Sequence, residues 1–440
     1  MEDQKKIKIG LFYTLSILIV LLWGIDLEYI QRQGILPKGF NNISKILSYG
    51  LILAIPFSLI KILKILKSSK IIWYFTIWVF FSTIISYFIT KFLGYEPRFS
   101  NEVRTITQLG GFSIGIILGY YLSNLLEQNP TFLKFIIHIS IFIVILGIFY
   151  QLITQQIIGS PGKKYEGRLF GLSGEPKFLA LYIAPYLIAF IISTKRFSFM
   201  KFVYVFLLFI AFIFTKSSTA FIALFFIIAI FLKVYGLKKV KVINFISSSL
   251  VVIFLIYLLP DFFGLKDVIF GRISNYAQGI YDSDLHEVFT FPLIGTVTVE
   301  ANEYPVLLYF KDNPYFIFTG IGMGQESILS FGIVDSLEGG SGFLKPGRGG
   351  YITPNSSLLQ NTANFGLLFI IVLFFWTFNL ASKYHKDLEE NEKFIFYFFF
   401  SHFIIHLIIF KTYVPISTSL FILLSFFNLL KKKRKTNHKF

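Results

Sequence analysis

The chain has 440 residues, of which 55% are hydrophobic and 19% aromatic, and it carries a formal net charge of +17. A mean hydropathy of +0.69 excludes an ordinary soluble protein, which needs far more polar surface. The absence of cysteine excludes disulfides and thiolate metal sites. Lys and Arg at the cytoplasmic ends of membrane spans account for the positive charge, so it does not indicate nucleic-acid binding.

Long apolar segments recur along the chain, most of them about 17–22 residues long, the length of a helix that crosses roughly 30 Å of hydrocarbon. They predict an all-α polytopic membrane protein with about 12 transmembrane helices. The predicted spans are 8–25, 46–61, 71–91, 106–126, 132–154, 178–194, 198–215, 218–233, 243–260, 355–381, 393–411 and 413–430. The first lacks a small-residue cleavage site and is predicted to be a retained span rather than a cleaved signal.

The chain is predicted to have four parts. Residues 1–259 carry spans one to nine with short loops, residues 355–430 carry spans ten to twelve, and residues 431–440 form a basic tail. Between them lies a long polar loop at 260–354, predicted to contain short helices, with 11 acidic residues against five basic ones. The remainder of the chain is predicted to be a scaffold that holds this loop at one face of a bilayer.

The distribution of Lys and Arg predicts the topology. With the N-terminus inside, the inner segments hold 24 of the 41 basic residues, whereas the short outer segments hold 12. Cytoplasmic loops carry such an excess, so both termini are expected in the cytoplasm and the long loop outside. Membrane lipid is an expected partner of the spans, and the basic tail is a candidate to contact anionic lipid.

Six of the eight arginines lie outside under this topology, where the charge bias disfavours them. They are Arg32, Arg98, Arg104, Arg168, Arg272 and Arg348. The planar guanidinium binds phosphate and carboxylate through two parallel hydrogen bonds. Arginine on the outer side therefore favours anion recognition, with ordinary loop arginines as the alternative.

Two short outer loops carry candidate anion-binding residues. The loop at 155–177 has five glycines and four basic residues, and Glu175 and Pro176 then open span six. Proline suits the first turn of a helix and a helix N-terminus favours anions, so this loop is a candidate phosphate cradle. At the end of span seven, Lys216 lies beside three hydroxyl side chains, one of which is a candidate helix cap.

The long loop contains two further patterns. Gly320, Gly322 and Gly324 alternate, but no parallel strand unit surrounds them, so they do not indicate a nucleotide-binding loop. Further on, Arg348 is brought to the membrane just before Asn355 or Ser356, the candidate helix N-caps that lead into span ten.

Four segments of the chain, taken in order, resemble the O-antigen ligase/polymerase family of bacterial envelope proteins. They are "GRLFGLSGEPKFLA" at 167–180, "FTKSSTAFIAL" at 214–224, "NPYFIFTGIGMG" at 313–324 and "TPNSSLLQNTANFGLL" at 353–368. The plan of twelve spans with one long outer loop is similar to that family too. The resemblance implies a multi-pass enzyme of the bacterial inner membrane whose long loop is periplasmic. Its substrate would be an undecaprenyl-pyrophosphate-linked oligosaccharide, used at the outer face.

Members of that family are of two kinds: polymerases join repeat units, whereas ligases move the finished chain to an acceptor lipid. Ligases usually carry His before the Asn of the last segment, and Pro354 stands there in this chain, which favours a polymerase. The family often has Arg where Ser218 stands, and Lys216 is the candidate substitute. A chain-length regulator protein is a candidate partner.

The resemblance implies inverting glycosyl transfer with neither a metal nor another cofactor. Pyrophosphate is a good leaving group, so the site mainly has to neutralise its charge and to deprotonate or orient the acceptor hydroxyl. The predicted catalytic residues are Glu175, Arg168 and Arg348, and the predicted pyrophosphate-binding residues are Arg168, Lys216, Arg272, Arg348 and Asn355. Glu175 is preferred as the base over His286 and Glu326, and pairing with Arg168 is its structural alternative.

Two other patterns have both a chemical and a structural interpretation. The segment "YDSDLHE" at 281–287 is a candidate metal site, although a solvated acidic turn is preferred. His402 and His406 lie four residues apart in span eleven, and His138 lies in span five. For these histidines, hydrogen bonds between helices are preferred to a metal pair or a proton relay.

A flippase or transporter of lipid-linked oligosaccharides is the main alternative outside the family. It would be expected to carry charges inside its spans and to have two related halves, and the sequence indicates neither. A glycosyltransferase of another type would be expected to carry acidic metal ligands in its first outer loop, where Asp26 and Glu28 lie.

Overall fold

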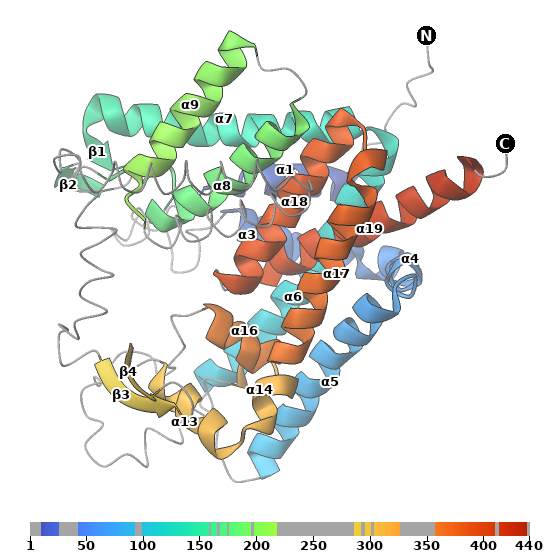
Figure 1. Ribbon diagram of the computed structural model, residues 1–440, viewed down its shortest axis with the longest axis vertical. Helices are drawn as coiled ribbons and strands as arrows, with labels where there is room; N and C mark the ends of the chain where they lie inside the picture. The colour runs from blue at the N-terminus through green and yellow to red at the C-terminus, as the bar shows by residue number, and fades with distance from the viewer. Residues whose placement is uncertain are drawn as a thin grey trace.

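The computed structural model shows a helical protein with two small β-hairpins (Figure 1). The residues it describes are 10–25, 43–92, 99–157, 160–164, 168–173, 176–194, 198–217, 286–291, 295–300, 303–325, 357–409 and 413–437. Predicted spans eight and nine, at 218–233 and 243–260, fall outside these residues.

The described elements follow one another along the chain as helices interrupted by the two hairpins. The helices before the long loop are α1 (Leu11–Leu21), α3 (Ile43–Gly50), η1 (Leu51–Ala54), α4 (Ile55–Leu66), α5 (Lys70–Phe92), α6 (Phe99–Gln128), α7 (Pro130–Thr154), α8 (Pro176–Ser193) and α9 (Phe199–Phe214). The helices within the long loop and after it are α13 (Tyr304–Asp312), α14 (Tyr315–Thr319), α16 (Ser357–Phe365), α17 (Leu367–Tyr384), η5 (His385–Asp387), α18 (Glu390–Ile408) and α19 (Tyr413–Asn437). The antiparallel hairpins pair β1 (Gln156–Ile157) with β2 (Ser160–Lys164) and β3 (His286–Phe291) with β4 (Gly295–Glu300).

Seven described helical stretches are long and apolar enough to cross a membrane. They are Ile43–Leu66, Lys70–Ile89, Glu102–Gln128, Pro130–Thr154, Pro176–Ser193, Leu367–Asp387 and Tyr413–Arg434. By length and composition, this confirms the prediction of a multi-pass membrane protein. The helices at predicted spans one and seven are shorter, with 11 residues in α1 and 16 residues in α9.

Predicted span ten is wrong as a single helix, because the chain breaks at Gly366. α16 ends at Phe365 and α17 begins at Leu367, while Gly366 between them has φ 83°. A residue at positive φ cannot continue a right-handed helix. A Cβ atom at Gly366 would lie 2.6 Å from the carbonyl carbon of Thr319, so only glycine fits where α14 passes the break.

The described part of the range 260–354 holds the short helices α13 and α14 and also the β3–β4 hairpin. The all-α prediction omits this hairpin and the smaller β1–β2 pair. The β3–β4 strands read HEVFTF and GTVTVE, in which β-branched and aromatic residues that favour strands recur. Their register places His286 opposite Glu300 and Phe291 opposite Gly295.

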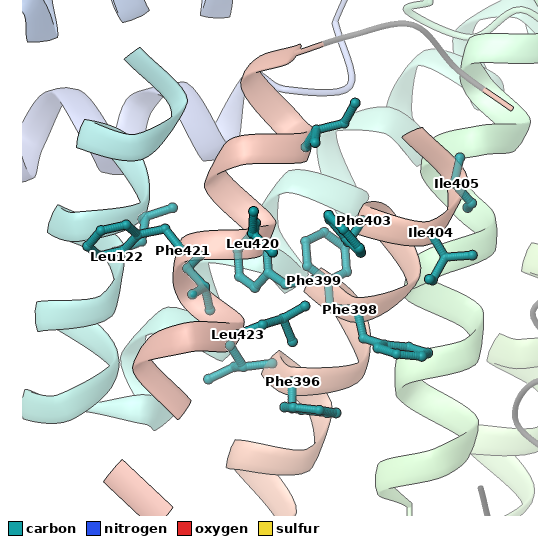
Figure 2. Packing of buried hydrophobic residues seen from close by; sticks show 14 of the residues in the cluster. Leu122, Phe396, Phe398, Phe399, Phe403, Ile404, Ile405, Leu420, Phe421 and Leu423 are labelled. Atoms are coloured by element: carbon teal, nitrogen blue, oxygen red, sulfur yellow. The ribbon is translucent and has the colours of Figure 1, made fainter. Parts of the chain in front are cut away.

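α18 is the centre of the described bundle, and every residue from Phe394 to Leu407 is buried. Figure 2 shows its phenylalanines packed against Leu420 and Leu423 of α19, with Leu122 of α6 beside Phe421. A helix that is apolar on all sides is typical of a core position. α18 is therefore enclosed by other helices rather than placed at the edge of the bundle.

α6 and α19 pack together at close to backbone contact. A Cβ atom at Gly115 of α6 would lie 2.5 Å from the carbonyl oxygen of Val414, and one at Gly119 would lie 2.7 Å from Cβ of Phe421. The Thr418 hydroxyl donates to the Gly115 carbonyl at 3.0 Å. Small residues allow such approaches between membrane helices, so these two glycines set the distance between α6 and α19.

α7 and α18 run in the same direction. Near their starts, Lys134 Nζ donates to Asn391 Oδ1 at 3.0 Å, and one turn further along each helix the ring of His138 packs on Phe394. α8 runs the opposite way, because Tyr182 packs on His402 and its later residue Tyr186 packs on Phe394. The bundle therefore has two ends: α7 and α18 begin at what we call the Lys433 end and finish at what we call the Arg168 end.

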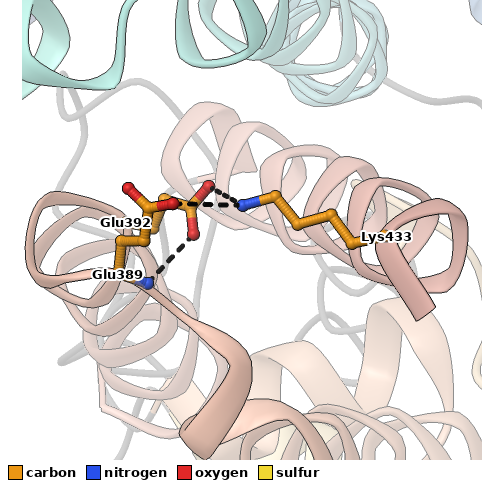
Figure 3. Close-up of polar contacts among 3 residues, drawn as sticks. All are labelled: Glu389, Glu392 and Lys433. Atoms are coloured by element: carbon orange, nitrogen blue, oxygen red, sulfur yellow. Dashed lines mark hydrogen bonds and ion pairs between the residues drawn. The ribbon is translucent and has the colours of Figure 1, made fainter. Parts of the chain in front are cut away.

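Ion pairs close the Lys433 end. Lys433 of α19 donates to the buried carboxylate of Glu392 at 2.7 Å (Figure 3), and Arg434 contacts Asp387 at 2.6 Å. Glu389 and Glu392 also cap the start of α18 reciprocally, since each side chain accepts a backbone hydrogen bond from the other end of the turn. This end carries the segments that the charge count assigns to the cytoplasm.

Candidate functional site

Arg168 and Lys216, predicted from separate loops, lie in contact at the Arg168 end. Arg168 Nε donates to the carbonyl of Thr215 and Nη2 donates to the carbonyl of Lys216, both at 3.4 Å. The neighbouring backbone is joined too, because the Leu169 N–H donates to the Phe214 carbonyl at 2.9 Å. Arg168 and Lys216 are both half-buried. Two residues predicted to bind the same anion are therefore at one place.

Lys216 has a left-handed backbone, with φ 48°. Its N–H donates to the Ile213 carbonyl at 2.9 Å, which closes the last turn of α9, and its own carbonyl accepts from Arg168. A side chain other than glycine at positive φ is strained, and such residues cluster at functional sites. The turn thus combines an unfavourable conformation with a cation from the predicted site.

The loop that carries Arg168 rests on Gln151, a fully buried residue near the end of α7. Gln151 Oε1 accepts from the N–H groups of Phe170 at 2.8 Å and Gly171 at 2.9 Å, and Nε2 donates to the Arg168 carbonyl at 2.9 Å. The sequence prediction missed Gln151. A lone amide inside an apolar span was the available signal, since such residues hydrogen-bond within the protein.

The start of α8 completes this corner of the bundle. α8 begins at Pro176, as the sequence predicted, and Ser173 just before it is buried and donates to the Gly24 carbonyl at 3.2 Å. The loop is thereby tied to the end of α1 as well as to α7 and α9. A helix N-terminus favours anions, so this position adds to the cationic character of the corner.

The other predicted site residues lie outside the described residues. They are Glu175, Arg272, Arg348 and Asn355, together with the alternative base Glu326 and the acidic segment 281–285. His286 is described only as the first residue of β3, opposite Glu300. Their parts in the site stay predictions.

The alternate glycines after α14 are packing positions. Gly320, Gly322 and Gly324 all have positive φ and are buried. A Cβ atom at Gly322 would lie 2.8 Å from Cα of Thr83 in α5, and one at Gly324 would lie 2.7 Å from Cα of Thr105 in α6. Glycine is required here because the segment passes directly over the backbone of two helices.

Three amide side chains of α16 join it to the neighbouring helix ends. Asn361 Nδ2 donates to two carbonyls in the last turn of α18, at 3.0 and 2.7 Å. Gln360 and Asn364 both donate to the hydroxyl of Tyr413, which begins α19, and Asn364 Oδ1 accepts from the Gly324 N–H at 3.4 Å. The fourth segment of the resemblance contains α16, so its amides join the end of α18 to the start of α19 at the Arg168 end of the bundle.

The buried histidines make contacts with aromatic rings and with each other. His138 Nδ1 contacts the Tyr186 hydroxyl at 2.5 Å, a bond between α7 and α8 of the kind that the sequence favoured. His402 and His406 instead contact each other within α18, with ring nitrogens 3.4 Å apart, and Trp23 stacks on His402. Among the described residues, no three His, Asp or Glu side chains gather as metal ligands.

The four segments of the resemblance meet in pairs at the Arg168 end. The first and second meet through Leu169 and Phe214, and the third and fourth meet where the Ile321 N–H donates to the Ala363 carbonyl at 2.6 Å. Comparisons with protein-family models, with curated proteins and with solved structures find no match. The function is therefore inferred from the site and from the four segments.

Proposed function

We propose that the chain is a membrane glycosyltransferase that polymerises undecaprenyl-pyrophosphate-linked oligosaccharide repeat units into a surface polysaccharide, such as O-antigen or capsule. The reaction takes place at the outer face of a bacterial inner membrane, and the loop at 260–354 lies in the periplasm. The twelve spans comprise the seven long helices, α1, α9, α18 and the segments 218–233 and 243–260. Both termini lie in the cytoplasm.

The observation that carries this proposal is the contact between Arg168 and the turn at Thr215 and Lys216. A pyrophosphate carries its charge on two adjoining phosphoryl groups, so it is bound best by more than one cation. The two carbonyl contacts hold the guanidinium against the turn that carries Lys216. Lys216 supplies a second cation from the same turn, at the Arg168 end of the apolar bundle.

In the proposed reaction, a hydroxyl of the acceptor sugar attacks the anomeric carbon of the donor. The bond from that carbon to the pyrophosphate oxygen breaks, the bonding electrons leave with the lipid pyrophosphate, and the anomeric configuration inverts. Arg168, Arg348 and Lys216 stabilise the charge that develops on the leaving group, because positioned cations act most strongly in a site shielded from water. Glu175 takes the proton of the acceptor hydroxyl. Arg272 and Asn355 complete the pyrophosphate contacts.

Reconstitution tests the proposal. Purified protein in lipid vesicles, supplied with undecaprenyl-pyrophosphate repeat units, is expected to yield a ladder of longer lipid-linked glycans and free undecaprenyl pyrophosphate. Vesicles without protein are the control. Transfer that occurs only when a second acceptor lipid is added would identify a ligase. Movement of unchanged substrate across the membrane would identify a flippase, and either result would overturn polymerisation.

A further inference from the structure

Gln151 is a polar side chain inside a helix that is otherwise mostly apolar. It lies near the end of α7, where its neighbours are apolar, and it is fully buried. A buried amide without hydrogen-bond partners destabilises the folded protein, so a buried glutamine is expected to make specific hydrogen bonds. The bonds of Gln151 go to the backbone of the loop that carries Arg168.

The geometry of those bonds fixes three residues of the loop at once. The amide oxygen accepts from Phe170 and Gly171, and the amide nitrogen donates to the Arg168 carbonyl, all at 2.8–2.9 Å. An amide has two acceptor lone pairs and two N–H donors, so both acceptor positions are used here. Gly171 has φ 57°, and its N–H reaches the same oxygen as that of Phe170.

Arg168 is thus held from two sides. Gln151 holds its carbonyl, and the carbonyls of Thr215 and Lys216 hold its guanidinium. The direction of the side chain depends on the direction of the backbone from which it leaves. Release of the backbone on the Gln151 side would let the guanidinium shift relative to Lys216.

We infer that Gln151 is a positioning residue for pyrophosphate recognition: it fixes the backbone at 168–171 so that the Arg168 guanidinium stays against the Lys216 turn. This inference rests on the proposed function, in which Arg168 and Lys216 bind the pyrophosphate. Gln151 itself does not touch the substrate. Other anchors keep the loop folded without it, because Leu169 bonds Phe214 and Ser173 bonds Gly24.

The test measures how strongly inorganic pyrophosphate inhibits polymerisation by the full-length protein in vesicles. Gln151→Leu is expected to weaken inhibition roughly 10- to 100-fold, the scale on which small displacements of a binding group act. Arg168→Ala is expected to weaken it at least as much. The double variant is expected to match Arg168→Ala alone, because residues that act through one group do not add.

A second variant gives a readout that a purely structural role would not move. In Gln151→Glu, the carboxylate can accept from Phe170 and Gly171 but cannot donate to the Arg168 carbonyl. Protonation restores the donor, so inhibition by pyrophosphate should recover as the pH is lowered. Gln128→Glu is the matched control, because Gln128 is exposed at the end of α6, which lies at the Lys433 end; it should behave like the native protein.

The outcomes separate the two claims. If Arg168→Ala leaves inhibition unchanged, the proposed site fails and the inference fails with it. If Arg168→Ala weakens inhibition but Gln151→Leu does not, only the inference is overturned. The inference is also overturned if Gln151→Leu, added to the Arg168→Ala variant, weakens inhibition by the same factor as it does when it is the only substitution. Should Gln151→Leu fail to fold, the pH profile of Gln151→Glu still decides, since a flat profile contradicts the inference.

Discussion

The two ends of the bundle hold their arginines and lysines in different ways. At the Lys433 end, Lys433 and Arg434 are matched with the carboxylates of Glu392 and Asp387. At the Arg168 end, two backbone carbonyls hold the guanidinium. A carboxylate partner neutralises a cation, whereas a backbone carbonyl orients it without adding a negative charge. The first arrangement closes the helical bundle; in the proposed function, the second holds the guanidinium beside Lys216, where both contact the pyrophosphate.

The largest effect that separates the two ends is expected from Arg168→Ala. Removal of one group that stabilises the developing charge costs roughly 10²–10³ in rate, so polymer formation in the vesicle assay should slow by that factor and stay measurable at long reaction times. Arg434→Ala removes the same side chain at the other end and should leave the rate unchanged. Equal losses in both variants would show that the two ends do not differ in function.

A second variant tests whether the segment after α14 serves packing rather than chemistry. Gly322→Ala places a methyl group against the backbone of Thr83 at φ 92°, so it should destabilise the protein by roughly 1–3 kcal/mol. Thermal unfolding in detergent measures this. Gly110→Ala is the control, because a Cβ atom there meets nothing within 4 Å and alanine favours the helix. A stable but inactive Gly322→Ala variant would contradict the packing role.

Lys216→Gly should separate stability from activity. Glycine relieves the left-handed strain at this position and should stabilise the fold by about 1 kcal/mol. The loss of the cation should still lower the polymerisation rate roughly tenfold or more. Gln155→Gly is the matched control, since Gln155 also has positive φ, at 54°: it should gain stability and keep its activity. Full activity in Lys216→Gly would remove Lys216 from the site.

The smallest effect is expected at the Lys433 end. Lys433 is 41% exposed, so the loss of its ion pair in Lys433→Ala should cost about 1 kcal/mol or less in the free energy of unfolding. Addition of Glu392→Gln should recover part of that loss, because a buried amide needs no counter-charge. Activity should not change in either variant. A fall in rate at constant stability would mean that this end also takes part in function.

The positions of most described helices could be predicted from sequence because apolar length is set by the thickness of the membrane. Predicted span 132–154 corresponds to Pro130–Thr154, and predicted span 178–194 corresponds to Pro176–Ser193. The break at Gly366 could not, since one glycine in an apolar run does not show that another segment crosses it. Close passage of α14 forces the positive φ there, and that is a tertiary contact.

Two residues of the candidate site could be predicted from sequence by their residue types, but the contact between them could not. A basic, glycine-rich loop and a lysine at a span end pointed to Arg168 and Lys216. Their contact joins residues 48 apart, which no spacing rule predicts. Gln151 was missed because, in that apolar span, only His138 was considered for a chemical role. The amides of α16 were noticed only as part of a resemblance, and their hydrogen bonds to α18 and α19 give them a structural role.

The enclosure of α18 bears on how the protein is assembled in the membrane. α18 is not among the seven stretches apolar enough to cross a membrane on their own, since it opens with charged residues and carries Ser401, His402 and His406. Polar groups make the insertion of a single helix unfavourable. α8 is synthesised before it and α19 after it, so α18 should wait until α19 emerges and enter with it as a helical hairpin. A nascent chain that stops after Ile408 would then leave its last helix outside the lipid.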